Sequence, residues 1–304
     1  MEHTSPKNNL PPALVKLMLV FLFVIWSNSF TAIRHLRELF SPQRLILARF
    51  LPAAVISATY LLAGRTRRAE CGEIIRKNSW RIIAMSVFGV AGYNFFLYLG
   101  QTEIKPGAAA LITTLSPIFT LILSVLFLRV KPPLKRVLGV FIAFGGLVAV
   151  IKWGRIGLNL ELSEFRYAAL ATMAPVSWAV YTVIGKNLAG TYKPVTVSYL
   201  SLSIGTVPFL FLFDGEFIAT AATMSGTHWL ALGHLSLLCT VVGYLIWNTG
   251  LKYLPATSVA SFIYLNPPFA AAFGWAFWGE DISVFFLFGS AVILFGLYLA
   301  QGKK

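Results

Sequence analysis

Charge is scarce in this 304-residue sequence, since only 12% of the residues are Asp, Glu, Lys or Arg and just 11 are acidic. A soluble domain usually has about 25% charged residues, so an extensive water-facing surface is excluded. Mean hydropathy is +0.75 and 57% of the residues are hydrophobic, as expected of a chain that lies mostly in lipid. The sequence therefore predicts an integral membrane protein.

Residues that support catalysis or metal binding are also rare. Cys71 and Cys239 offer neither a disulfide framework nor a zinc site. The four histidines are scattered, and no HExxH or GxSxG motif occurs. We therefore expect that the protein binds no metal or cofactor and is not an enzyme. The alternative function is an integral-membrane enzyme that acts on a lipid-soluble substrate. A non-transporting receptor or scaffold is disfavoured because the loops are short.

Long apolar runs are what the sequence does contain. A membrane-crossing helix needs about 20 residues, and the runs are apolar throughout rather than alternating as in a β-barrel. The first run ends in bulky residues with no signal-peptide cleavage site, so we expect it to be retained as a helix. The sequence predicts an all-α membrane protein with ten transmembrane helices, over residues 13–33, 43–63, 80–100, 107–128, 134–151, 165–188, 195–213, 229–250, 256–278 and 283–301.

Basic residues are unevenly distributed between the two sides of this topology. With both termini in the cytoplasm, 17 of the 25 Lys and Arg residues lie inside, but only three of the 11 acids do. This asymmetry indicates a multi-pass protein of the cytoplasmic (inner) membrane with both termini inside and anionic lipids at that face. Because topology accounts for the net charge of +14, we expect no nucleic-acid partner.

Part of the sequence occurs twice. Proline and glycine recur at matched positions, which an apolar composition alone does not explain. The aligned pairs, at offsets of 150 to 152, are Pro117 with Pro267, Gly139 with Gly289, Gly146 with Gly296, Tyr93 with Tyr244, Trp26 with Trp178 and Pro42 with Pro194. Because each repeat has five helices, an odd number, the second repeat enters the membrane from the side opposite to the first. The sequence therefore predicts two inverted five-helix repeats, residues 1–152 and 153–304, as in many secondary transporters.

Several of these residues also carry a family likeness. They are Trp26 to Phe30, Pro42, Arg49-Phe50, Gly100, Pro106 to Ala110 and Ser116-Pro117, with Gly250 to Ala256, Asn266-Pro267, Gly279-Glu280 and Gly289 in the second copy. The chain resembles the ten-helix drug/metabolite transporter superfamily, specifically proteins with two EamA-type domains. The resemblance implies a permease for amino acids, other metabolites or drugs. One departure is Val130, which stands where the second copy has the family's acidic residue, Glu280.

Polar and aromatic side chains within the predicted helices are costly in lipid and mark a candidate cavity. The alternatives are that the hydroxyl stripe packs helices together and that Trp and Tyr form interfacial belts. We expect a small-molecule substrate and a monomer. The candidate cavity residues are Trp26, Asn28, Asn94, Tyr98, Ser116, Trp178, Tyr181, Tyr244, Trp247, Asn248, Tyr264 and Asn266.

Three further residues suggest specific roles. Pro117 and Pro267 remove backbone donors in mid-membrane, so each either bends a helix beside the cavity or forms a static kink. Arg49 lies within a predicted helix, where it snorkels to the outer surface, pairs inside the bundle or anchors a substrate carboxylate. The first two readings of Arg49 are favoured. No acid lies securely at mid-membrane, so facilitated diffusion and an unusual coupling both stay open. The leading hypothesis is an exporter that works by alternating access.

Overall fold

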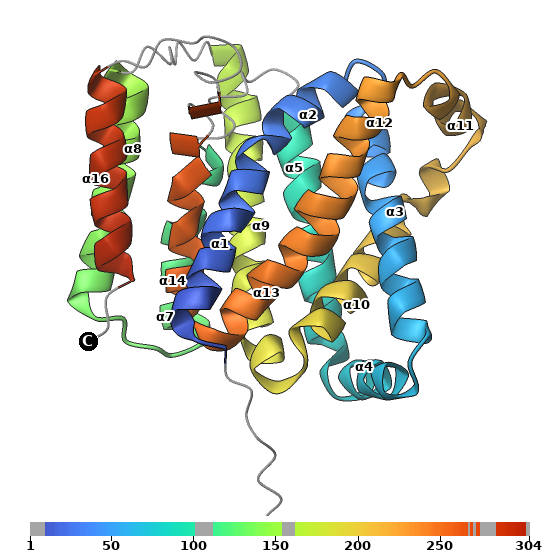
Figure 1. Cartoon of the computed structure of the whole chain (residues 1–304), viewed down its shortest axis with the longest axis horizontal. Coiled ribbons are helices and arrows are strands. Elements are labelled where there is room, and N and C mark those ends of the chain that lie inside the picture. Colours follow the sequence, from blue (N-terminus) through green and yellow to red (C-terminus); the bar gives the residue numbers. More distant parts are fainter. Residues whose placement is uncertain are drawn as a thin grey trace, which may run out of the picture.

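The computed structural model is a bundle of helices that run side by side (Figure 1). It describes residues 10–100, 112–153, 162–266, 268–269, 272–273 and 284–301, and every regular element in these ranges is helical. The all-α prediction is confirmed for this part of the chain. Five described stretches are long and apolar enough to cross a membrane: Pro12–Leu36, Pro42–Leu62, Arg65–Gly100, Pro194–Leu212 and Gly226–Tyr253.

The two aligned prolines at 42 and 194 each begin a helix. Helix α3 spans Pro42–Leu62 and helix α10 spans Pro194–Thr206, continuing as a 3-10 turn (Val207–Leu212). Proline suits the first helical position because its missing N–H would have no partner there. Both helices pack against each other on one side of the bundle, next to α4 (Arg65–Ser86), whose kink at Asn78 separates a basic first half from an apolar second half.

The first predicted helix is two helices in the structure. Helix α1 covers Pro12–Ser27 and helix α2 covers Ser29–Leu36, with Asn28 between them. The hydroxyl of Ser27 donates to the carbonyl of Val24 (2.9 Å), and that of Ser29 donates to Trp26 (2.7 Å). Such back-bonding competes with the helical ladder, which explains why the single helix expected over 13–33 is interrupted.

Two π-helical segments interrupt the helices that enter the centre of the bundle. Segment η1 (Val87–Gly92) joins α4 to α5 (Tyr93–Gly100), and η3 (His234–Val242) joins α12 (Gly226–Gly233) to α13 (Gly243–Tyr253). A π turn leaves backbone carbonyls free for partners outside the helix. The indole N–H of Trp26 donates to Cys239 (2.9 Å), and the hydroxyl of Tyr244 donates to Gly89 (2.8 Å). Each segment is thus tied to a distant helix.

Helix α7 (Ser116–Phe127) begins one residue before Pro117, so the predicted bend falls at a helix boundary. Pro267 and Glu280 lie outside the described residues. Helix α7 packs against the long helix α9 (Leu162–Thr191) and against α14 (Ala256–Ser261), which continues as the 3-10 segment η4 (Phe262–Leu265). The buried hydroxyls of α7, those of Ser116, Thr120 and Ser124, have no hydrogen-bond partner among the described residues.

Helices α8 (Leu134–Trp153) and α16 (Val284–Ala300) form a closely packed pair at one edge of the bundle (Figure 1). A methyl group on Gly139 would lie 2.6 Å from the carbonyl oxygen of Gly296, and one on Gly146 would lie 2.9 Å from that of Gly289. From Gly139 to Gly146 the residue numbers rise along α8, while those of the contacting glycines fall from Gly296 to Gly289 along α16. The two helices are therefore antiparallel. Gly139 and Gly146 thus allow the backbones of α8 and α16 to approach closely.

We predict that Gly139→Val destabilises the protein by about 1–3 kcal/mol, because the added carbons meet backbone atoms that cannot move aside. Gly145→Val on the same helix is the matched control, since nothing lies within 4 Å of a methyl group at that position. Thermal unfolding of the detergent-solubilised variants measures the difference. Equal melting temperatures would show that the α8–α16 contact is not a stabilising one.

Candidate functional site

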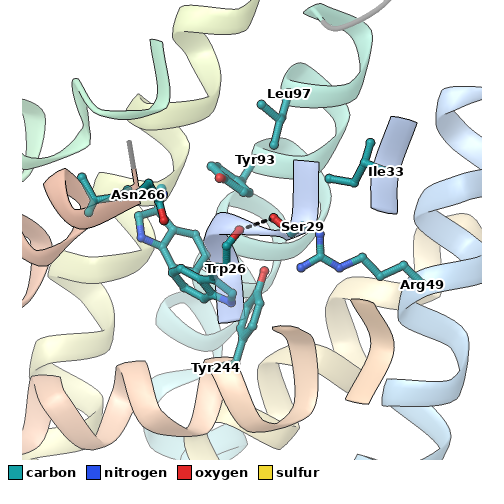
Figure 2. A pocket seen from close by; sticks show the side chains of 10 residues that line it. Trp26, Ser29, Ile33, Arg49, Tyr93, Leu97, Tyr244 and Asn266 are labelled. Atoms are coloured by element: carbon teal, nitrogen blue, oxygen red, sulfur yellow. Dashed lines mark hydrogen bonds between the residues drawn. The ribbon is translucent and has the colours of Figure 1, made fainter. Parts of the chain in front are cut away.

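A narrow cavity lies at the centre of the bundle (Figure 2). The volume that the centres of water molecules can occupy in it is about 40 Å³, which is space for a few waters. The lining comes from α1, α2, α3, α5, α9, η4 and α13, which include elements of both halves of the sequence. The lining residues are Trp26, Ser29, Ile33, Arg49, Tyr93, Leu97, Trp178, Tyr244, Ile263 and Asn266.

Aromatic rings in mutual contact form the wall of this cavity. Trp178 meets Trp26 at a centroid distance of 5.5 Å, Tyr93 at 5.0 Å and Tyr244 at 5.4 Å. Behind this layer, Trp26 stacks on Trp247. Contacts between ring edges and faces stabilise such a cluster beyond the area that it buries. The wall is therefore a rigid apolar surface with few polar groups.

Arg49 supplies the positive charge of the cavity. Its side chain is only 6% exposed, with Nε donating to the hydroxyl of Thr240 (2.8 Å) and Nη1 donating to Asn94 (3.2 Å) and Tyr98 (3.0 Å). Of the two favoured readings of Arg49, snorkelling to the outer surface is wrong, because the side chain is buried. Polar side chains of α5 and η3 accept three hydrogen bonds from it inside the bundle, which lowers the cost of burying the charge.

A second polar network supports the opposite wall. The side-chain amide of Asn248 donates to the hydroxyls of Tyr181 (2.6 Å) and Ser198 (2.9 Å) and to the carbonyl of Tyr244 (3.0 Å). Asn248 is fully buried and does not line the cavity. Tyr181 stacks on Trp178 at 4.8 Å, so the network holds the aromatic wall in place.

The predicted residues fall into distinct layers of the structure. Five of them line the cavity: Trp26, Arg49, Trp178, Tyr244 and Asn266. Five others contact that lining from behind: Asn94, Tyr98, Tyr181, Trp247 and Asn248. Ser116 and Tyr264 are buried away from the lining, and Asn28 is half-buried at the α1–α2 break.

Sequence reasoning missed Tyr93, Leu97, Ile33 and Ile263 as lining residues. The one available signal was the alignment of Tyr93 with Tyr244 in the duplication. The other three are apolar, and nothing in the sequence separates them from residues that face lipid or pack against other helices.

One group among the described residues has the composition of a metal site. The ligand atoms of His35, Glu38 and His228 lie within 4.8 Å of one another, where α2 and α12 meet away from the cavity. The two imidazole rings are stacked with centroids 4.2 Å apart and planes 9° apart. A metal ion binds in the plane of an imidazole ring, so two stacked parallel rings cannot share one unless a ring turns. The geometry does not favour a metal here.

An exposed ion pair joins α3 to α11 (Gly215–Ala222). Arg44 pairs with Asp214 (2.9 Å) and with Glu216. The backbone N–H of Phe217 and the Arg44 side chain hold the pKa of the Asp214 carboxyl below its ordinary value. A lowered pKa means that the contact stabilises the fold above the unfolded-state pKa and weakens as the pH falls. Arg44 is thus a paired arginine on the same helix as Arg49.

Long apolar helices around an aromatic cavity with a buried cation are typical of a multi-pass membrane transporter. The chain belongs to the EamA-like transporter family, whose model matches residues 14–152 and 166–301. The resemblance found in the sequence is confirmed.

Relatives of similar length carry transporter names. An uncharacterized transporter of Archaeoglobus fulgidus is 28% identical, with 95% of this chain and 99% of the relative covered. A probable terminal-alkyne amino-acid exporter of Streptantibioticus cattleyicolor is 25% identical, covering 94% and 92%. The inner membrane transporter YedA of Escherichia coli, itself uncharacterized, is 23% identical, covering 93% and 89%. A crystal structure with a TM-score of 0.74 and 17% identity covers 95% of this chain and 96% of its own, and it shares the fold.

We predict that Tyr244→Phe lowers stability by about 1–3 kcal/mol, because the carbonyl of Gly89 loses its donor in a buried π segment. Tyr298→Phe on α16 is the control, since its side chain is 74% exposed. Thermal unfolding of both variants in the same detergent compares them. If the two variants have the same melting temperature, the role assigned to the Tyr244 hydroxyl is wrong.

Proposed function

We propose that this protein exports small organic metabolites, such as amino acids or amphipathic drugs, across the cytoplasmic membrane. It does so by alternating access of two inverted five-helix repeats, residues 1–152 and 153–304. The observation that carries the proposal is the central cavity, which both halves line with aromatic side chains and which holds a buried cation. Such a site suits a solute with apolar surface and a few polar groups.

Contacts between aligned positions support the inverted arrangement. Gly139 meets Gly296 and Gly146 meets Gly289, although Gly139 aligns with Gly289 and Gly146 with Gly296. A reciprocal contact of this kind between antiparallel helices is what a two-fold axis in the membrane plane produces. The aligned residues Trp26 and Trp178 also touch each other, as residues near such an axis would.

The narrow cavity supports a mechanism in which the halves move. The space holds only a few waters, so a metabolite enters when the helices around it separate. Two helix boundaries offer places for that movement: Pro117 at the start of α7, and Asn28 between α1 and α2. The aligned Pro267 lies outside the described residues, and its bending role rests on the duplication alone. These bends let one bundle rock against the other while the site itself stays fixed.

The relatives support the kind of substrate and the direction. One is named as a probable amino-acid exporter and another as an inner membrane transporter. We propose that this chain likewise transports small organic solutes outward. We expect it to act as a monomer, with both termini in the cytoplasm and anionic lipids at that face. The excess of basic residues on one side of the predicted topology supports this orientation.

Tyr244→Ala and Asn248→Leu are expected to reduce transport by about tenfold or more while leaving membrane insertion intact. The first removes part of the cavity wall, and the second removes the amide that holds Tyr181 and Tyr244. Efflux of a solute panel from proteoliposomes is the measurement, with lipid-exposed Tyr298→Ala as the control. Unchanged efflux in both cavity variants would sink this site assignment, and no efflux of any solute by the wild-type protein would sink the function.

Cys71 provides a direct test of orientation. It is half-buried in the basic half of α4, whereas Cys239 is buried. With both termini inside, a membrane-impermeant maleimide is expected to label Cys71 in inside-out vesicles and not in intact spheroplasts. Cys71→Ser is the control for residual labelling of Cys239. Labelling from the outer side alone would reverse the topology.

A further inference from the structure

The charge balance of the cavity points to the class of substrate. Arg49 is buried at the centre of the bundle, and all its hydrogen-bond acceptors are uncharged: the hydroxyls of Thr240 and Tyr98 and the amide of Asn94. The ion pairs of the described residues involve His35, Arg44 and Lys77, and none includes Arg49. The site thus holds a cation whose neighbours stabilise it without neutralising it.

The guanidinium group also has unused donors. Nε and Nη1 make the three hydrogen bonds, while Nη2 donates to none of those acceptors. Arg49 lines the cavity, and Figure 2 shows its head group directed into it. A buried cation is costly when it lacks a counter-charge, and a planar guanidinium group suits a carboxylate, which it can bind through two parallel hydrogen bonds. Arg49 is therefore placed to pair with an anion that enters the cavity.

The rest of the lining describes what is attached to that anion. Trp26 and Tyr93 present aromatic surface between Arg49 and the far side of the cavity, where Asn266 lies (Figure 2). Trp178, which contacts both rings, also lines the cavity. Asn266 is buried, and its side-chain oxygen accepts no hydrogen bond from the part of the chain that the structure describes. An unsatisfied buried acceptor favours a ligand with an N–H or O–H group at that end.

We propose that the cavity selects small organic anions: a carboxylate pairs with Arg49, an aromatic or apolar body lies against Trp26 and Trp178, and a hydrogen-bond donor meets Asn266. This inference rests on the proposed transport function and names the substrate class of the same site. The cavity must widen to admit such a molecule, in keeping with alternating access.

Three compounds that differ at one end test the charge requirement. 4-Hydroxyphenylacetate is an anion, its amide is neutral and tyramine is a cation, and all three share the ring and the distal hydroxyl. Binding to purified protein in nanodiscs is followed by quenching of tryptophan fluorescence and by thermal shift, because a ligand of the folded state raises its melting temperature. We expect the acid to bind at least about tenfold more tightly than the amide, and tyramine least.

Variants then assign the preference to Arg49. Arg49→Gln is expected to remove the preference for the acid over the amide, and Arg49→Lys to keep part of it because the charge remains. Arg44→Gln, on the same helix but outside the cavity, is the matched control and is expected to keep the full preference. If Arg49→Gln fails to fold, the three compounds and Arg49→Lys still decide the question with folded protein.

Several results of these experiments would overturn the inference. Equal or tighter binding of the amide, or an Arg49→Gln protein that still prefers the acid, overturns the inference. Stabilisation by sodium chloride alone, with no further effect of the acid, shows that Arg49 holds an inorganic ion and overturns it as well. Efflux of neutral or cationic solutes alone refutes anion selection but leaves transport standing, whereas acid binding without efflux of any solute refutes transport but leaves the binding site standing.

Discussion

The interior of this protein depends on two wide helical turns, η1 and η3, that give up part of their own hydrogen bonding. In a membrane, water cannot satisfy the released carbonyls, so protein donors must. Trp26 and Tyr244 are those donors, and each reaches a π segment from the other half of the sequence. The same two side chains line the cavity. Trp26 and Tyr244 therefore both join the two halves and line the cavity. A substitution of either residue is expected to alter the contact between the halves as well as the solute site.

Arg49 depends on the same arrangement. Its partner Thr240 lies in η3, where the hydroxyl also donates to the carbonyl of Leu235, five residues earlier. Asn94 and Tyr98 are presented by α5, directly after η1. A buried arginine is tolerated because three uncharged groups from two segments converge on it, which fixes its position without removing its charge. The cavity thus retains an electrostatic preference.

The sequence predicted helix starts and helix contacts better than it predicted which side chains face the cavity. Pro42, Pro194 and the glycines of α8 act locally, through proline geometry and close backbone approach, so their roles could be inferred without a structure. The faces of α5 could not. Asn94 and Tyr98 were predicted to line the cavity, but Tyr93 and Leu97 line it, whereas Asn94 and Tyr98 accept hydrogen bonds from Arg49. Periodicity shows which residues share a face of a helix but not which face meets the cavity.

The aligned halves of the sequence differ at the polar residues of the site. At the offset that aligns Pro42 with Pro194, Arg49 aligns with Ser201, and at the offset that aligns Tyr93 with Tyr244, Asn248 aligns with Leu97. The polar groups of the two halves are therefore not equivalent: one half places a cation beside the cavity, while the other places an uncharged amide network behind the aromatic wall. A symmetric cavity would treat both ends of a solute alike. The two ends of this cavity differ, so we expect a solute with one charged end to bind in a single orientation.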